Sequence, residues 1–141
     1  MSLKLNLKPY ERLIVGGAVI ANGSHKTELF IENKALVLRE KDIMTTQHAD
    51  THCKKLYLAI QLMYIDEKNL TEYYDVYWKL VRELINAAPR LISIIDSMNE
   101  HIISGRYYPA LKLAKELIHF EEEALNGIKG SVVREQQYVG A

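Results

Sequence analysis

Hydrophobic and polar residues alternate along the first part of the chain. In segment 3–7 leucine alternates with polar residues, the pattern of a strand with one solvated face. Gly16-Gly17 and Asn22-Gly23 are dipeptides that favour two-residue hairpin turns. The other short segments with strand character are residues 12–15, 18–21, 27–32 and 35–38. This pattern predicts a small antiparallel sheet or barrel, which needs a helix or a second subunit to cover its apolar face.

Apolar residues with helical spacing dominate the rest of the chain. Residues 56–65 are almost wholly apolar, and their 3, 4 spacing favours a helix. Asn69, three residues before Glu72, predicts the capped start of a second helix. Pro89 predicts the end of that helix and the start of the next, and Gly105 is a predicted C-terminal cap before a last helix.

Together these patterns predict an α+β protein. The expected organisation is a small N-terminal antiparallel β-sheet or barrel module in residues 1–45, which is also the expected RNA-binding part. A helical bundle is expected in residues 51–126. The glycine-containing polar segment 127–141 is expected to form a flexible tail.

Composition and charge narrow the functional class only slightly. The chain of 141 residues is 48% hydrophobic and 26% charged, as in ordinary globular proteins. A single cysteine excludes an internal disulfide, and no apolar segment is long enough to span a membrane, so a cytoplasmic location is expected. Net charge is zero, but residues 1–55 carry a formal charge of +3 and residues 56–141 one of −3. This split fits a first module that meets an anion, or simply two solvated surfaces.

Basic residues flank the apolar segment 35–38. Arg39 follows it directly, Lys41 comes two residues later, and Lys34 precedes it. In one interpretation Arg39 makes bidentate contacts with RNA and Lys41 supplies a point charge. In the other, both cations form ion pairs with the neighbouring acids of the sheet edge. The candidate RNA-binding residues are Arg39, Lys41, Lys34, Arg12 and Lys4.

An aromatic cluster begins at Tyr73. Its density suggests stacking on RNA bases, but its spacing favours a core or interface stripe on a helix. The candidate interface residues are Tyr73, Tyr77, Trp78 and Tyr107.

The sequence offers little that resembles a catalytic or metal site. His48 and His52 have the spacing of ligands on a helix and Cys53 follows, but no second ligand pair lies nearby in the sequence. There is no serine nucleophile motif and no phosphate-binding glycine loop. We therefore expect no catalytic residue, no metal, no cofactor and no enzymatic activity.

Four stretches resemble the FlbT family of alphaproteobacterial flagellin-mRNA repressors. They are LKLNLKPYERLIVGGAVIANG, ENKALVLREKDIM, KKLYLAIQLMYID and SGRYYPALKLAKELIHFEEEAL, and they cover most of residues 3–125. The resemblance implies a post-transcriptional repressor that associates with the 5′ untranslated region of a flagellin mRNA and promotes its degradation. It also implies interplay with the small flagellar regulator FlaF. The alternative is a protein–protein regulatory module that binds a FlaF-type regulator and affects RNA indirectly. Whether the chain forms a homo-oligomer stays open.

The segment ERLIVGGAVI followed by ALVLREKDI is also similar to the CsrA family of small β-proteins that bind RNA. In that family an apolar strand that ends in an arginine next to acidic residues carries RNA at the sheet edge. Arg39 matches this position. In this chain a helical half takes the place of that family's short terminal helix, and whether the family's dimer geometry is shared stays open.

Overall fold

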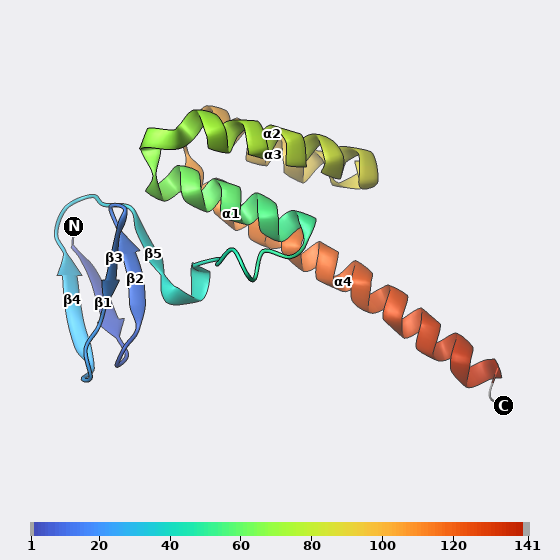
Figure 1. The fold of residues 1–141 in the computed structure, drawn as a ribbon, viewed down its shortest axis with the longest axis horizontal. Coiled ribbons are helices and arrows are strands. Elements are labelled where there is room, and N and C mark those ends of the chain that lie inside the picture. The colour runs from blue at the N-terminus through green and yellow to red at the C-terminus, as the bar shows by residue number, and fades with distance from the viewer. Residues whose placement is uncertain (1, 140–141) are drawn as a thin grey trace.

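The computed structural model describes residues 2–139, and the side chains of residues 2–127. Five strands precede four helices, which confirms the predicted α+β class (Figure 1). The strands are β1 (Leu3–Leu7), β2 (Arg12–Val15), β3 (Ala18–Ala21), β4 (Thr27–Ile31) and β5 (Val37–Arg39). The helices are α1 (His52–Ile65), α2 (Leu70–Ala87), α3 (Ile92–Ile103) and α4 (Tyr107–Val139). Single 3-10 turns lie at Glu40–Asp42, Glu67–Asn69 and Pro89–Leu91.

The strands form two small antiparallel sheets. β1 pairs with β4, and β2 lies between β3 and β5. The β2–β3 connection is the predicted hairpin at Gly16-Gly17, where φ is +57° and +85°. Both residues occupy the left-handed region, which a two-residue hairpin turn requires and glycine tolerates best.

The second hairpin predicted from the sequence, at Asn22-Gly23, is wrong, because β3 and β4 belong to different sheets. Asn22 instead anchors the crossing between the sheets. Its Nδ2 donates to the carbonyl oxygens of Lys8 and His25, each at 2.8 Å. Its Oδ1 accepts a hydrogen bond from the Thr27 hydroxyl at 2.9 Å. The side-chain bonds of Asn22 therefore replace the two-residue turn that the dipeptide suggested.

The core is divided between the strands and the helices. Leu5, Leu7 and Leu13 form a small buried cluster within the β-module. Ile14 and Leu38 belong instead to the larger core of the helices. The sheet thus covers part of its apolar surface with helices, as its small size requires.

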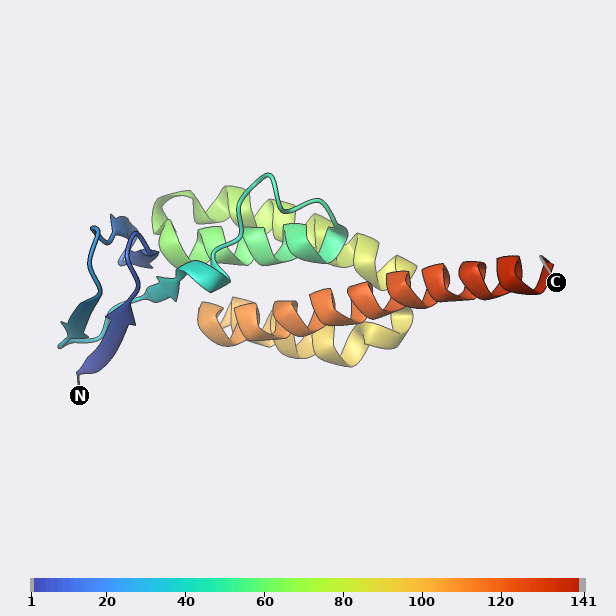
Figure 2. The same cartoon turned by 90° about the horizontal axis from the view of Figure 1, so that it is seen from below.

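Two further contacts connect the β-module to α1. The hydroxyl of Tyr64 accepts a hydrogen bond from the backbone N–H of Val37 at 3.2 Å. A Cβ placed on Gly17 would lie only 2.9 Å from the carbonyl oxygen of Ile65, so the β2–β3 hairpin closely approaches the last turn of α1. The β-module therefore lies at one end of the helical bundle (Figures 1 and 2).

Within the bundle, α1 contacts both α2 and α4, and α3 packs against α4 (Figure 2). Gly105 follows Ser104, the C-cap residue of α3, and has the φ of +72° that such a helix end requires. The predicted side-chain cap at Asn69 is wrong: its Nδ2 donates to Asp66 Oδ2 at 2.9 Å, because a 3-10 turn precedes α2. The start of the helix was predicted correctly, but its local cause differs.

The predicted flexible tail, residues 127–141, lies almost entirely outside the residues whose side chains are described, and it stays a prediction. Pro109 lies in the first turn of α4, where its missing N–H costs no hydrogen bond. In the described part of the chain, no helix combines the length and the apolar character needed to cross a bilayer.

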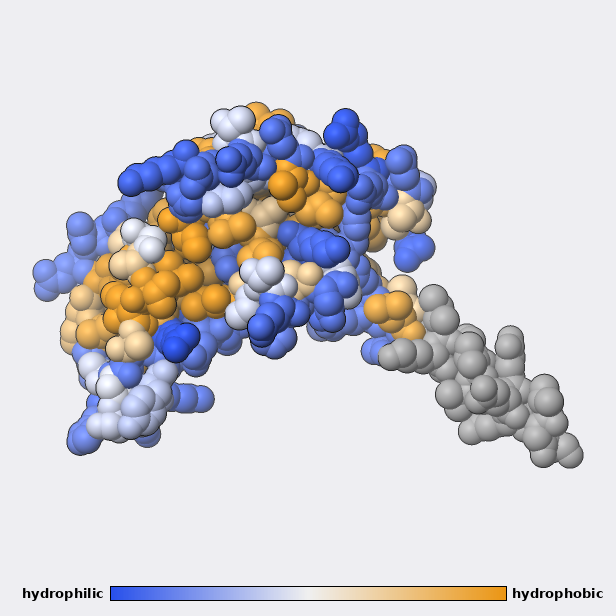
Figure 3. Space-filling view, in the orientation of Figure 1, coloured by the Kyte–Doolittle hydropathy of each residue, from blue (hydrophilic) through white to orange (hydrophobic). Residues whose placement is uncertain are grey.

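Several large apolar side chains remain exposed on the β-module. Tyr10, Val19 and Phe30 are 70%, 67% and 57% exposed. Figure 3 shows apolar residues gathered over this module and over its junction with the helices.

A candidate nucleic-acid interface

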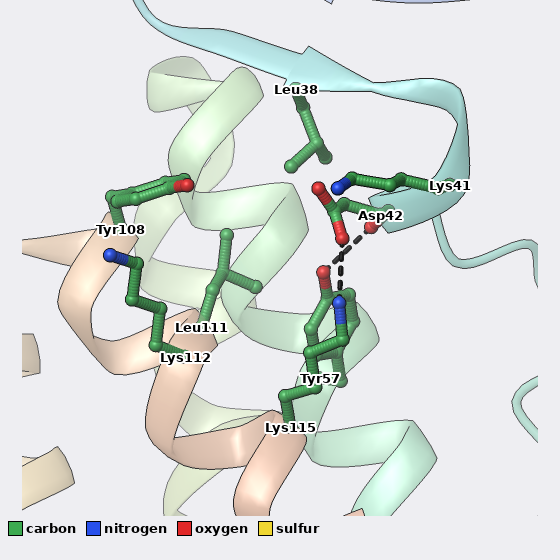
Figure 4. A pocket seen from close by; sticks show the side chains of 8 residues that line it. All are labelled: Leu38, Lys41, Asp42, Tyr57, Tyr108, Leu111, Lys112 and Lys115. Atoms are coloured by element: carbon green, nitrogen blue, oxygen red, sulfur yellow. Dashed lines mark hydrogen bonds and ion pairs between the residues drawn. The ribbon is translucent and has the colours of Figure 1, made fainter.

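A cleft of about 190 Å³ lies where the β-module meets α4 (Figure 4). Its β-module side comes from the end of β5 and the turn Glu40–Asp42, and its other side from α1 and α4. The α4 residues are spaced by three or four positions, so they share one helical face. The lining residues are Leu38, Lys41, Asp42, Tyr57, Tyr108, Leu111, Lys112 and Lys115.

Asp42 fixes the geometry of this cleft. Its Oδ1 accepts a hydrogen bond from Lys115 Nζ at 2.7 Å, and its carbonyl oxygen accepts one from the Tyr57 hydroxyl at 2.6 Å. Burial raises the pKa of Tyr57, and the neighbouring Asp42 carboxylate raises this pKa further. Tyr57 therefore stays protonated and donates this bond near neutral pH.

The other polar groups give the cleft a positive and aromatic character. Lys112 Nζ lies 4.9 Å from the ring centroid of Tyr108, a cation–π distance, and the Tyr108 side chain is 44% exposed. Among the described residues, neither Lys41 nor Lys112 has a carboxylate within ion-pair distance. Three ammonium groups thus face one carboxylate, which suits an anion such as a phosphate.

Arg39, the central candidate of the sequence analysis, connects strands instead of pointing freely to solvent. Its Nη2 donates to the Asn6 carbonyl oxygen at 2.7 Å and pairs with Glu11 Oε2 at 3.2 Å. The backbone N–H of Lys8 donates to Glu11 Oε1 at 2.9 Å. That backbone bond, together with Arg39, lowers the pKa of Glu11. The ion-pair interpretation therefore fits Arg39, but with a partner 28 residues away in place of the adjacent acids.

The other predicted RNA-binding residues are dispersed. Lys4 on β1 pairs with Glu28 on β4 at 3.3 Å. Arg12 and Lys34 are exposed, at the start of β2 and in the loop after β4. Of the five candidates, Lys41 is the one that lines the cleft described above.

The predicted interface tyrosines mostly make contacts within the chain. Tyr77 is fully buried, its hydroxyl donates to Asn99 Oδ1, and its ring meets half-buried Trp78 edge-on at 5.0 Å. The spacing allowed Tyr77 either a core or an interface position, and the structure places it in the core.

The two remaining hydroxyls of this set are also engaged. Tyr73 donates to Asp66 Oδ2 at 2.6 Å, and the hydroxyls of Tyr107 and Tyr74 lie 2.7 Å apart. The Tyr74–Tyr107 contact connects α2 to the start of α4.

His52 and Cys53 interact with groups on other helices of the bundle. His52 Nε2 lies 2.9 Å from the Leu80 carbonyl oxygen and 3.3 Å from Glu83 Oε2. The pKa of the Cys53 thiol is raised to about 12, mainly by burial and secondly by the nearby Glu121 carboxylate. Within the part of the chain that the structure describes, no three His, Cys, Asp or Glu side chains are placed to hold a metal ion.

The contribution of Tyr108, Lys112 and Lys115 on α4 was not predicted from the sequence. A signal was present, because these residues recur at positions i, i+4 and i+7 and so form a basic-aromatic stripe. Nothing local indicated that this stripe faces Lys41, about 70 residues earlier in the chain.

Comparison with known proteins places this chain among flagellar proteins. The family model described as "Flagellar protein FlbT" matches residues 3–125. No solved structure matches the chain.

Individual relatives agree with the family match. "Probable flagellum biosynthesis repressor protein FlbT 1" of Bradyrhizobium diazoefficiens is 44% identical over 124 residues, 87% of this chain and 84% of the relative. A Rhodopseudomonas palustris relative, "Probable flagellum biosynthesis repressor protein FlbT", is 40% identical over 126 residues, 89% of this chain and 99% of the relative. "Flagellum biosynthesis repressor protein FlbT" of Caulobacter vibrioides is 34% identical over 134 residues, 94% of this chain and 95% of the relative. The chain therefore belongs to the FlbT family of flagellar proteins.

Proposed function

We propose that this protein represses flagellum biosynthesis by binding the 5′ untranslated region of a flagellin mRNA and promoting its degradation. The names of its relatives support the repressor part of this proposal. The observation that carries the RNA part is the convergence of Lys41, Lys112 and Lys115 on one cleft from two separate parts of the fold. This cleft takes the place of the Arg39-centred edge expected from the sequence.

The mechanism follows from electrostatics. Each lysine that contacts a phosphate releases counterions from the RNA, which makes binding favourable and salt-dependent. Asp42 holds Lys115 in place through an ion pair of 2.7 Å. Occupancy of the leader then exposes the transcript to a nuclease that acts in trans.

A double variant, Lys41→Ala with Lys112→Ala, tests this proposal in a gel-shift titration of flagellin leader RNA. On a single strand, each phosphate contact contributes about 0.7 to the steepness of log K against log salt. If the electrostatic contribution vanishes at about 1 M salt, the loss of two contacts makes binding about 25-fold weaker at about 0.1 M salt. Lys79→Ala with Arg82→Ala removes the same charge from the exposed surface of α2 and is the matched control. Binding as tight as that of the parent, in a folded cleft variant, would refute the proposal.

A second candidate function rests on a groove between α1 and α2 of about 350 Å³. Its lining is mainly apolar and includes Val76, which is 51% exposed, and the predicted interface residue Tyr73. Such a groove suits an amphipathic helix of a partner protein. The proposed partner is the FlaF-type regulator that the family resemblance implies. In this case Val76→Asp abolishes partner binding and leaves the affinity for leader RNA unchanged.

A further inference from the structure

The cleft between the β-module and α4 does not end at Lys41. Lys41 also lines a second cavity, of about 360 Å³, together with Lys8 and Arg39. Lys8 in turn lines a third cavity, of about 540 Å³, together with Lys26. Shared lining residues thus connect three depressions into one path that runs from α4 over the β-module.

Lysines recur along the whole path. We call this set the lysine track, and it consists of Lys26, Lys8, Lys41, Lys112 and Lys115. All five are exposed. Among the described residues, only Lys115 of this set has a carboxylate within ion-pair distance. The track therefore presents cations to solvent along its full length.

Four acidic residues line the same path, and three of them are already neutralised by the protein's own cations. Glu11 pairs with Arg39 at 3.2 Å, and Glu28 pairs with Lys4 at 3.3 Å.

The third pair joins Asp42 to Lys115 at 2.7 Å, and the fourth acid, Glu40, is exposed. Arg39 and Lys4 therefore act as internal counterions for Glu11 and Glu28. Among the described residues, the other track lysines, Lys8, Lys26, Lys41 and Lys112, have no ion-pair partner. This explains why a chain of zero net charge still presents a basic surface.

We infer that the lysine track binds one extended single strand of RNA that crosses both the β-module and α4. This inference rests on the proposed function and specifies its ligand. A single strand can follow a path across separate depressions because its backbone bends freely, whereas a rigid duplex contacts only the highest points. At the α4 end, the exposed ring of Tyr108 offers an aromatic surface for a base.

The test uses the full chain and fluorescence anisotropy with a labelled 20-nucleotide oligouridine and with a duplex RNA of equal length. We expect the single strand to bind at least tenfold more tightly than the duplex. Lys8→Ala with Lys26→Ala removes the far end of the track. We expect this change to make the negative slope of log K against log salt shallower by about 1.4, the value for two phosphate contacts on a single strand.

Two comparisons separate this inference from the proposed function. Lys41→Ala with Lys112→Ala removes the cleft end, and Lys79→Ala with Arg82→Ala removes two charges from α2. If the cleft variant loses affinity but the Lys8 and Lys26 variant keeps its salt slope, the track is wrong and the cleft stands. If neither the Lys41 and Lys112 variant nor the Lys8 and Lys26 variant changes binding of oligouridine or of flagellin leader RNA, both proposals fail.

Two further outcomes would also overturn the inference. Equal affinity for the duplex would refute single-strand binding. Displacement of the RNA by polyglutamate at equal charge concentration would make the track a surface for an acidic protein segment. Thermal unfolding of each variant, compared with that of the parent, shows whether a loss of binding reflects loss of the fold.

Discussion

Lys115 on α4 and Asp42 in the turn after β5 form an ion pair of 2.7 Å between residues 73 positions apart in the sequence. This pair joins the last helix to the end of the β-module and also lines the candidate RNA cleft. The same carboxylate therefore has two opposing effects: it helps to hold the two parts together, and it lowers the positive charge available to a phosphate.

Replacing Asp42 by Asn tests this double role. Removing a negative charge from the cleft should tighten binding of flagellin leader RNA several-fold. The lost ion pair is partly exposed and should cost at most about 1 kcal/mol of unfolding free energy. RNA titration and urea denaturation measure the two effects. The control is Asp96→Asn on the exposed surface of α3, which changes the net charge by the same amount. An equal gain in RNA affinity in that variant would show that the position of the removed charge does not matter.

Gly17→Ala should destabilise the junction between the β2–β3 hairpin and α1. Its φ of +85° is unfavourable for alanine, and the new Cβ would lie 2.9 Å from the backbone oxygen of Ile65. We expect a loss of about 1–3 kcal/mol in unfolding free energy, measured by urea denaturation. Gly23→Ala is the control, because Gly23 has no such φ and no neighbour within 4 Å of its Cβ. Similar losses for both variants would contradict this account of the junction.

Tyr77→Phe should lower stability without changing RNA binding. The substitution removes the bond to Asn99 from a fully buried site and should cost about 1–3 kcal/mol of unfolding free energy. Tyr77→Ala also leaves a cavity and should cost about 3–5 kcal/mol. Thermal unfolding of both variants checks the two costs, and an RNA titration of both variants checks that binding is unchanged. Binding of RNA by the Tyr77→Ala variant that is much weaker than that of the parent, under conditions in which the variant stays folded, would restore the base-stacking interpretation.

Cys53 should be unreactive in the folded protein. Its side chain is 2% exposed, and burial raises the pKa of the thiol to about 12. At pH 8 the thiolate fraction is then roughly one part in 10,000, and the thiolate is the reactive form. Reaction with a disulfide reagent should therefore be slow in buffer and fast in denaturing urea. Equally fast labelling in both conditions would contradict a buried thiol.

Local patterns predicted most of the secondary structure. Gly16-Gly17 produced the expected hairpin, and Gly105 the expected helix end, because in both cases the required backbone angle is a property of the residue itself. Asn22-Gly23 has an equally strong local pattern but failed. Strand pairing is decided by distant partners, and the Asn22 side chain forms bonds that no hairpin would use.

The candidate site depended on tertiary placement, which one sequence does not reveal. Arg39 is followed in the sequence by Glu40 and, three positions on, by Asp42. It pairs instead with Glu11, because the fold brings the start of β2 beside β5. Lys41 was found because it follows an apolar strand. Lys112 and Lys115 were missed because only the contact between α4 and the β-module turn makes them its neighbours.

Ultraviolet crosslinking of the parent protein to flagellin leader RNA, with mass spectrometry of the crosslinked peptides, tests the central claim most directly. If RNA occupies the cleft, the main crosslinks fall on the start of α4, at Tyr108 and the lysines that follow it, and on the turn that carries Lys41. Crosslinks confined to the exposed surfaces of α2 and α3, with none at either segment, would contradict the account.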